Sequence, residues 1–342
     1  MSENATREVQ SFCRICTGGC GVRLTVDADD RIVSVKGDKD QPMSKGYVCF
    51  KGLQAEEAHH GPARILRPLK RMPDGSFAEI GLELALDEIA EKLRPYYESG
   101  NRDAIALFNG NGASLCSSAH GMHFSFPASL GTSAHYTTVT IDQSNKIVSF
   151  ERLGGWPAGP QGVEGSDVAM LFGANPIISH ACVGFLFADP KRRLKDAKDN
   201  GLKLIVIDPR ETETAREADI HLQPIPGQDA AIAGGLIRII LDEGWHDADF
   251  TGRFCTPEGM AALREAVDPL TEVMVEQRAG LKPGQLRAVA EMFARDSRRG
   301  AVYSATGPSF SPHGNLTQHL MDTLNVICGR FRRAGDSITL DV

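Results

Sequence analysis

Two patterns of hydrophobic and polar residues divide the chain. Before Pro62, apolar and polar residues alternate over Val22–Val26 and again over Ile32–Val35, on either side of a turn at Asp27–Asp30. Alternation with a period of two predicts a β-hairpin that buries one face. After Pro62, apolar residues recur at helical spacing or in short continuous runs. We therefore expect a small β-rich domain followed by a mixed α/β structure.

Short apolar runs predict four buried strands in this second part, and each run ends in a loop rich in Gly, Asn, Asp or Pro. The predicted strands are Ala104–Phe108, Val168–Phe172, Leu202–Ile207 and Ala301–Ala305, and the predicted helices are 86–93 (broken near Pro95), 229–242 and 283–297. Alternating strands and helices indicate the α/β class, with doubly wound parallel sheets that bind ligands beyond the carboxyl ends of the strands. We predict three domains, at residues 1–64, 65–165 and 166–342.

Composition narrows the possible partners and the compartment. The 342 residues are 42% hydrophobic and 24% charged, with a net charge of −7, which is typical of a globular protein and disfavours a broad basic surface for nucleic acid. The polar residues 1–10 include no apolar stretch and no twin arginine, so we expect no export. The uncharged stretch Val168–Ala188 is long enough to span a bilayer, but its Gly, Asn, Pro, Ser and His residues favour a strand and a loop. We expect a cytoplasmic protein without membrane insertion, whose thiols remain available as metal ligands.

Four cysteines carry the strongest chemical signal. Cys13-x2-Cys16-x3-Cys20-x28-Cys49 places three thiols on one glycine-containing loop and a fourth on a distant loop. This spacing predicts a [4Fe–4S] cluster; structural zinc, which usually uses two CxxC pairs, and four unrelated buried thiols are the alternatives. Lys51 follows two residues later. It is either an ordinary surface lysine or a cation between the cluster and a second redox centre.

The segment from Cys13 to Lys51 resembles the iron–sulfur domain of the molybdopterin oxidoreductases of the dimethyl sulfoxide reductase type. Further segments in the same order extend this resemblance along the chain: 173–180, 208–214 with 218–219, 226–229, and 307–336. The resemblance implies a molybdenum or tungsten ion held by two molybdopterin guanine dinucleotides. It also implies a two-electron redox or oxygen-atom-transfer reaction on a small-molecule substrate, with electrons passing through the [4Fe–4S] cluster to a partner protein.

The resemblance also implies which residues contact the dinucleotide. Glycines at strand ends offer backbone N–H groups to pyrophosphate, and carboxylates suit ribose hydroxyls and the guanine edge. The alternatives are that Asp208 and Pro209 only form a turn, that Asp229 only caps a helix, and that His180 is a core residue. The implied cofactor residues are Gly112, Gly173, Asn175, Pro176, His180, Asp208, Pro209, Arg210, Thr212, Gly227, Asp229 and Gly307.

The metal ligand implied by the resemblance lies in the stretch 140–150. Its register places Asp142 where formate and nitrate reductases carry cysteine, and a carboxylate suits high-valent molybdenum. Ser144 is a rival ligand. A third possibility is that no residue binds the metal and Asp142 only caps a helix. Ligation by Asp142 favours oxygen-atom transfer over formate oxidation.

Catalytic chains of this family usually continue for several hundred residues beyond the corresponding point. The sequence is therefore expected to be a fragment or one half of a split catalytic subunit, completed by a further chain or segment. Two other functions stay open. One is a non-catalytic electron-transfer or scaffold subunit, like the molybdopterin-like subunit of complex I, and the other is a non-redox hydratase of the same family.

Overall fold

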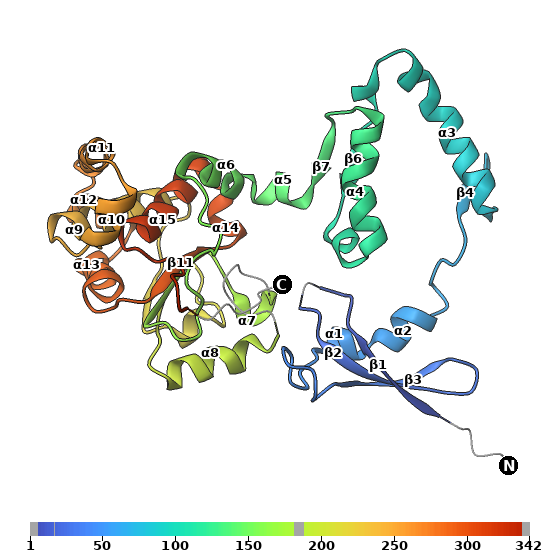
Figure 1. Cartoon of the computed structure of the whole chain (residues 1–342), viewed down its shortest axis with the longest axis horizontal. Coiled ribbons are helices and arrows are strands. Elements are labelled where there is room, and N and C mark those ends of the chain that lie inside the picture. Colours follow the sequence, from blue (N-terminus) through green and yellow to red (C-terminus); the bar gives the residue numbers. More distant parts are fainter. Residues whose placement is uncertain (1–5, 17, 181–187, 337–342) are drawn as a thin grey trace. The chain divides into compact units, whose positions relative to one another are not determined.

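The computed structural model describes residues 6–16, 18–180 and 188–336. The chain forms two compact units, Met1–Ile141 and Asp142–Val342, each described here by itself (Figure 1). The boundary falls inside the region that the sequence assigns to a middle domain at 65–165.

Unit 1 begins with a three-stranded antiparallel sheet in the order β1-β2-β3. The predicted hairpin is confirmed as β2 and β3, with Leu24 opposite Val35. Strand β1 was not predicted because its sequence is mostly polar. In the structure, only one of its six residues is partly buried and the other five are exposed. The elements are β1 (Arg7–Phe12), β2 (Gly21–Val26), β3 (Ile32–Gly37), α1 (Phe50–Leu53) and α2 (Ala55–His60).

The rest of unit 1 corrects two expectations. Helix α3 (Leu82–Glu98) continues through Pro95, because a proline in the last turn removes only one hydrogen bond. The predicted strand Ala104–Phe108 is wrong at its start, where a 3₁₀ turn (Arg102–Ala104) leaves the shorter strand β6. The remaining elements are β4 (Leu69–Arg71), β5 (Phe77–Glu79), β6 (Leu107–Asn109), α4 (Ser117–Leu130), β7 (His135–Thr137) and α5 (Thr138–Asp142), with β6 parallel to β7.

Unit 2 is built on a parallel four-stranded sheet in the order β10-β9-β8-β11. The strands are β8 (Val168–Phe172), β9 (Lys203–Ile207), β10 (Ile220–Leu222) and β11 (Gly300–Ser304). Three of them confirm predicted strands to within about a residue. Phe172 is in register with Ile207 and Ser304, so the carboxyl ends of β8, β9 and β11 form one edge.

Helices cover both faces of this sheet. Met170 and Phe172 pack into one apolar core with α9, α13 and α15, whereas Ala169 and Leu171 face a second core with α8. Every residue of β8 is fully buried, as expected for a central parallel strand. This is the predicted doubly wound α/β fold. The helices are α6 (Ser144–Leu153), α7 (Pro176–Ser179), α8 (Pro190–Asp199), α9 (Asp229–Asp242), α10 (Ala248–Phe254), α11 (Pro257–Val267), α12 (Glu272–Ala279), α13 (Gln285–Ala290), α14 (Thr306–Ser309) and α15 (Gly314–Ile327).

Side chains bind the outer backbone of β11, the edge strand of this sheet. The Val302 N–H donates to Asn325 Oδ1 (2.8 Å), and Asn325 Nδ2 donates to the Val302 carbonyl (3.1 Å). The Gly300 N–H donates to Gln161 Oε1 (2.8 Å). These amides replace the partner strand that an exposed edge otherwise invites.

The described part of the chain contains no helix with both the length and the apolar character needed to cross a membrane. The uncharged stretch at 168–188 contains β8 and α7 instead. Its residues 181–187, with Cys182, lie outside the described ones.

Candidate functional site

The four cysteines of the predicted cluster lie on loops that converge in unit 1. Cys13 follows β1, Cys20 precedes β2, and the Cys13 N–H donates to the Cys20 carbonyl (2.8 Å). Cys49 directly precedes α1. In α1, a Cβ on Gly52 would lie 3.2 Å from Cys13 Sγ. The same Cβ would lie 2.5 Å from Val48 Cγ2, so a larger residue would force both neighbours to move.

The charges of the thiols influence one another, as they do in a shared site. Burial raises the pKa of Cys20 to about 11, and Cys16, Cys13 and Cys49 add to this rise. Burial is also the main cause that raises the pKa of Cys13, whereas the charge of Lys51 lowers it. Lys51 therefore lies within electrostatic reach of the cysteine loop.

The donor set fits an iron–sulfur cluster. Within residues 6–16, 18–180 and 188–336, no three His, Cys, Asp or Glu side chains are grouped as around a single metal ion. A [4Fe–4S] cluster takes one thiolate per iron, so its ligands stand farther apart than those of one zinc ion. All seven cysteines in the described regions are free thiols. A cluster bound here would be held by Cys13, Cys16, Cys20 and Cys49.

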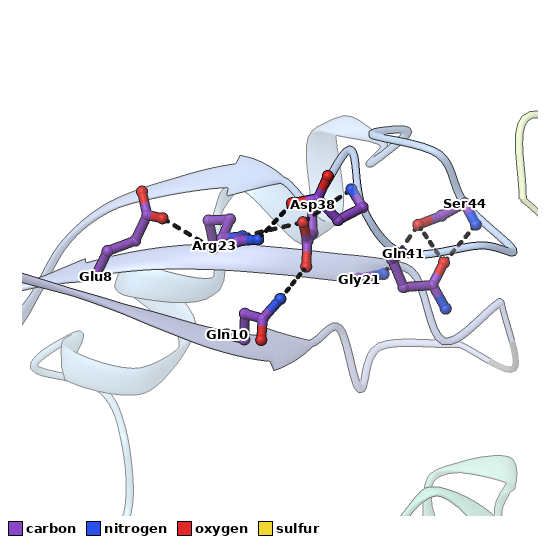
Figure 2. A network of polar contacts seen from close by, with 8 residues as sticks. Glu8, Gln10, Gly21, Arg23, Asp38, Gln41 and Ser44 are labelled. Carbon is purple, nitrogen blue, oxygen red and sulfur yellow. Dashed lines mark hydrogen bonds and ion pairs between the residues drawn. The ribbon is translucent and has the colours of Figure 1, made fainter.

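A polar network fixes the loop that leads to Cys49 (Figure 2). Asp38 is buried and accepts hydrogen bonds from Arg23 Nε (3.0 Å) and Gln10 Nε2 (3.1 Å). The hydrogen bond from Arg23 is the main cause that lowers the pKa of Asp38. Ser44 Oγ accepts from the Gly21 N–H (3.1 Å). The loop 38–44 is thereby attached to the start of β2, next to Cys20.

Gly112 also lies in unit 1, beside the cysteine loop. It lines a cavity of about 640 Å³ together with Cys13 and Gly52. In the same turn, the Leu115 carbonyl accepts a hydrogen bond from Arg14 Nε (3.2 Å).

In unit 2, two glycines meet at the point where the strand order reverses. Strands β8, β9 and β10 follow one another to one side, and β11 returns to the other side of β8. Such switch points are where doubly wound sheets bind ligands. Gly173 has φ +54°, and a Cβ there would lie 2.6 Å from Pro308 Cδ and 3.2 Å from Gly307 Cα. The loops that follow β8 and β11 therefore come into close backbone contact at the carboxyl edge of the sheet.

The segment after Gly307 gathers more of the predicted site. A Cβ on Gly227, which has φ +86°, would approach Pro312 Cδ to 4.0 Å. Gln143 Nε2, just before α6, donates to Thr306 Oγ1 (3.4 Å). The stretch 306–312 thus connects Gly173, Gly227 and the predicted ligand loop.

Asn175 joins the two loops that follow β8 and β9. Its Oδ1 accepts hydrogen bonds from Thr214 N (3.2 Å) and Thr214 Oγ1 (2.7 Å), and its Nδ2 donates to Glu213 Oε2 (2.8 Å). This donation is the main cause that lowers the pKa of Glu213. Asn175 therefore positions the loops. Sequence reasoning missed Glu213 because no local pattern relates two positions 38 residues apart.

Two predicted acceptors lie within electrostatic reach of each other. Asp208 follows β9, and its Oδ1 accepts a hydrogen bond from the Arg210 N–H (2.9 Å). This hydrogen bond closes the turn at Asp208 and Pro209 that the sequence offered as the alternative to cofactor contact. Asp229 is the first residue of α9. Burial is the main cause that raises the pKa of Asp229, and the charge of Asp208 raises it further. A donor-bearing ligand such as a ribose or guanine would relieve this repulsion.

The remaining predicted residues differ in their access to a ligand. Thr212 is 2% exposed, and its hydroxyl accepts a hydrogen bond from the Ala215 N–H (3.0 Å), which stabilises the turn of the loop. Arg210 is largely exposed. Pro176 is buried at the start of α7, and His180 ends that helix in a left-handed conformation (φ 55°). The Pro209 carbonyl accepts from Gln223 Nε2 (3.4 Å).

A cavity of about 450 Å³ opens beside the predicted ligand loop. It is lined by Ser144 and Asn145 of α6, by Arg152 and by residues 309–319. Three buried atoms near it have no hydrogen-bond partner in the described regions: Asn145 Oδ1, Ser309 Oγ and His319 Nδ1. Burial, and then the charge of Arg152, lower the pKa of His319. These groups fit a polar cofactor or a small anionic substrate.

Asp142 and Ser144 differ in their relation to this cavity. Asp142 is half-buried at the end of α5 and is not one of the residues that line it. The N-cap of α6 is Gln143, without a side-chain cap, so the expected alternative of Asp142 as a helix cap is wrong. Sequence reasoning missed Arg152, although it lies eight residues after Ser144 and so on nearly the same face of α6. It missed His319 because no local pattern relates that position to Ser144.

Two family models match the chain. Residues 6–60 match "Molybdopterin oxidoreductase Fe4S4 domain", and residues 64–340 match "Molybdopterin oxidoreductase". These ranges include every cysteine and loop described above.

Curated relatives are similar along nearly the whole chain. A nitrate reductase of Symbiobacterium thermophilum is 28% identical over 96% of this chain and 44% of its own length. Formate dehydrogenase H of Escherichia coli is 25% identical over 94% of this chain and 45% of its own. The chain thus spans less than half the length of the curated relatives it matches. The structure of acetylene hydratase from Pelobacter acetylenicus has the same fold, with a TM-score of 0.82 at 24% identity over 96% of this chain and 44% of its own.

Proposed function

Because this chain belongs to the molybdopterin oxidoreductase family, we propose that it forms the cluster-binding and central α/β part of an oxidoreductase catalytic subunit. The proposed cofactors are one [4Fe–4S] cluster and a molybdenum or tungsten ion held by two molybdopterin guanine dinucleotides. The proposed reaction is a two-electron oxidation or reduction, or an oxygen-atom transfer, on a small polar substrate.

One observation carries this proposal. The contact between Gly173 and Gly307 lies at the switch point of the sheet, and the stretch 306–312 leads from it to the polar cavity beside Ser144. Backbone N–H groups of these loops would bind pyrophosphate, and Asp208 and Asp229 would accept from ribose and guanine. When bound, the metal would supply the two-electron chemistry, and Asn145, Ser309 and His319 would orient ligands by hydrogen bonds.

The metal ligand that we propose is Asp142. Asp142 lies two residues before Ser144 in the sequence; Ser144 begins α6, lines the cavity and remains the rival ligand. X-ray absorption at the molybdenum edge separates them in the variants Asp142→Ala, Asp142→Asn and Ser144→Ala. Loss of a short Mo–O contact in both Asp142 variants and its retention in Ser144→Ala are expected. The reverse pattern would assign the ligand to Ser144.

Lys51 is proposed as the cation between the cluster and the nearer pterin, and a separate protein as the electron partner. A further chain or segment is proposed to complete the dinucleotide sites, since unit 1 leaves large apolar side chains such as Leu66 (82%) and Phe77 (65%) exposed. The free cysteines suit the reducing conditions of the cytoplasm, where we place the protein.

Metal and pterin analysis of the protein purified with its natural partner tests the proposal. We expect iron and acid-labile sulfide in equal amounts, molybdenum or tungsten, and guanine nucleotide released on denaturation. Iron without molybdenum, tungsten or pterin would instead establish a non-catalytic electron-transfer or scaffold subunit.

A further inference from the structure

A second cavity lies at the opposite edge of the sheet in unit 2. It has a volume of about 370 Å³ and is lined by segments 244–247, 294–298 and 328–330. Arg298, which lines this cavity, lies two residues before the first residue of β11. The loops at Gly173 and Gly307 instead follow the last residues of their strands. The cavity therefore opens at the amino edge of the sheet, away from the loops at Gly173 and Gly307.

The distinctive group in this cavity is the guanidinium of Arg330, which is 1% exposed. Its Nη2 donates to the carbonyls of Phe293 and Ser297 and to Ser297 Oγ (2.9 Å). Its Nε and Nη1 have no oxygen or nitrogen acceptor in the described part of the chain. The other neighbours of the guanidinium are the Cys328 thiol, which interacts with it, and the ring of Phe293, whose centre lies 5.0 Å from its central carbon. His246 Nδ1, in the same cavity wall, is likewise buried without a partner there.

The neighbouring acids are bound to other groups. Asp247 accepts from Arg333 Nη2 (2.8 Å) and from the Phe250 N–H (2.9 Å). Asp167 accepts from the N–H groups of Arg298 and Arg299 (2.8 Å each). Across residues 6–16, 18–180 and 188–336, no carboxylate lies within ion-pair distance of Arg330. Burial is the main cause that lowers the pKa of Arg330, and the charge of Asp167 only partly offsets it from longer range.

Arg295 and Arg298 add positive charge to the cavity wall. Arg295 pairs with Asp296 (2.7 Å) and with Glu291 (3.0 Å), so its charge is largely compensated. Among the described residues, the side chain of Arg298 makes one long hydrogen bond, from Nη1 to the Ala294 carbonyl (3.4 Å). Arg298 and Arg330 both line the cavity, and neither guanidinium forms an ion pair within the described part of the chain.

We propose that this cavity binds a small oxyanion, of the phosphate or carboxylate class, between Arg330 and Arg298. Burying a cation without its hydrogen-bond acceptors is costly, and an oxyanion supplies both the acceptors and the opposite charge. A guanidinium fork binds two oxygens of such a group side by side.

Thermal unfolding and calorimetric titration of the purified chain test this site. The probes are inorganic phosphate and acetate, against sodium chloride at equal ionic strength. We expect phosphate, acetate or both to raise Tm beyond the chloride effect, with heat of binding at one site. The two probes distinguish a phosphate-bearing from a carboxylate-bearing natural ligand.

Three variants decide whether the cavity is responsible. Arg298→Gln and Arg330→Met should each weaken binding at least about tenfold, the usual effect of losing a hydrogen bond to a charged group. Arg299→Gln is the matched control, because Arg299 has the same charge but binds Asp336 (2.8 Å) and does not line the cavity. If Arg330→Met fails to fold, Arg298→Gln still tests the site. The same affinity in Arg298→Gln and Arg299→Gln, or no effect of either probe beyond chloride, would overturn the proposal.

Discussion

Replacing Gly173 by alanine tests whether the two loops at the switch point need their close contact. The backbone of Gly173 is left-handed (φ +54°), and a Cβ there would lie 2.6 Å from Pro308 Cδ. Alanine therefore meets two separate penalties, one from its own backbone conformation and one from the opposing loop.

The size of each penalty follows from the geometry. A left-handed conformation costs an L-residue about 1–2 kcal/mol. Forcing a methyl group into a contact below 3.0 Å adds about 1–3 kcal/mol. The cost is not relieved by a rotamer change, because Pro308 Cδ belongs to the proline ring. We expect Gly173→Ala to lower the free energy of unfolding of unit 2 by about 2–5 kcal/mol.

Urea unfolding followed by tryptophan fluorescence measures this loss, because both tryptophans, Trp156 and Trp245, belong to unit 2. Gly165→Ala is the control: Gly165 has φ +75°, and no atom lies within 4 Å of its Cβ position. The control should lose only about 1–2 kcal/mol. Equal losses in the two variants would refute the argument that the loops are in obligatory contact.

Three further predictions concern single residues. Cys16→Ser should abolish the iron content and the reduced-state EPR signal, whereas Cys255→Ser should leave both unchanged; full iron in Cys16→Ser would contradict the cluster assignment. Lys51→Met should slow turnover at least about tenfold and leave the metal content and KM unchanged. The reason is that one charge near the cluster changes the energy of an added electron by on the order of 1–2 kcal/mol. A change in KM alone would indicate a substrate role. Burial raises the pKa of Asp322, so the folded state holds this proton more tightly than the unfolded state, and stability should fall as pH rises from about 4 through the raised pKa. Asp322→Asn should remove that fall from a series of urea midpoints against pH, and an unchanged pH dependence would show that another group causes it.

Local sequence patterns were sufficient where burial follows from neighbouring residues. The run Val168–Phe172 is one continuous apolar stretch, and all five residues are fully buried in β8. The predicted helix 229–242 is α9 residue for residue. The cysteine spacing predicted the [4Fe–4S] cluster, and the structure brings Cys13, Cys20, Cys49 and Lys51 within reach of one another's charge. Short, weakly apolar segments were predicted less well, as the polar strand β1 and the shortened strand β6 show.

Contacts between distant loops were decided only by the tertiary structure. Gly173 meets Gly307 because β11 crosses back to pair with β8, and no property of either loop alone specifies that neighbour. The hydrogen bond from Asn175 to Glu213 depends in the same way on β9 lying beside β8. The sequence by itself determined which of the longer apolar segments are buried and which four cysteines are spaced as cluster ligands, because hydrophobic periodicity and ligand spacing are local properties. Strand order determined which of the loop residues share a site. Strand order depends in turn on the whole chain, because burying both faces of the sheet under helices selects one overall arrangement.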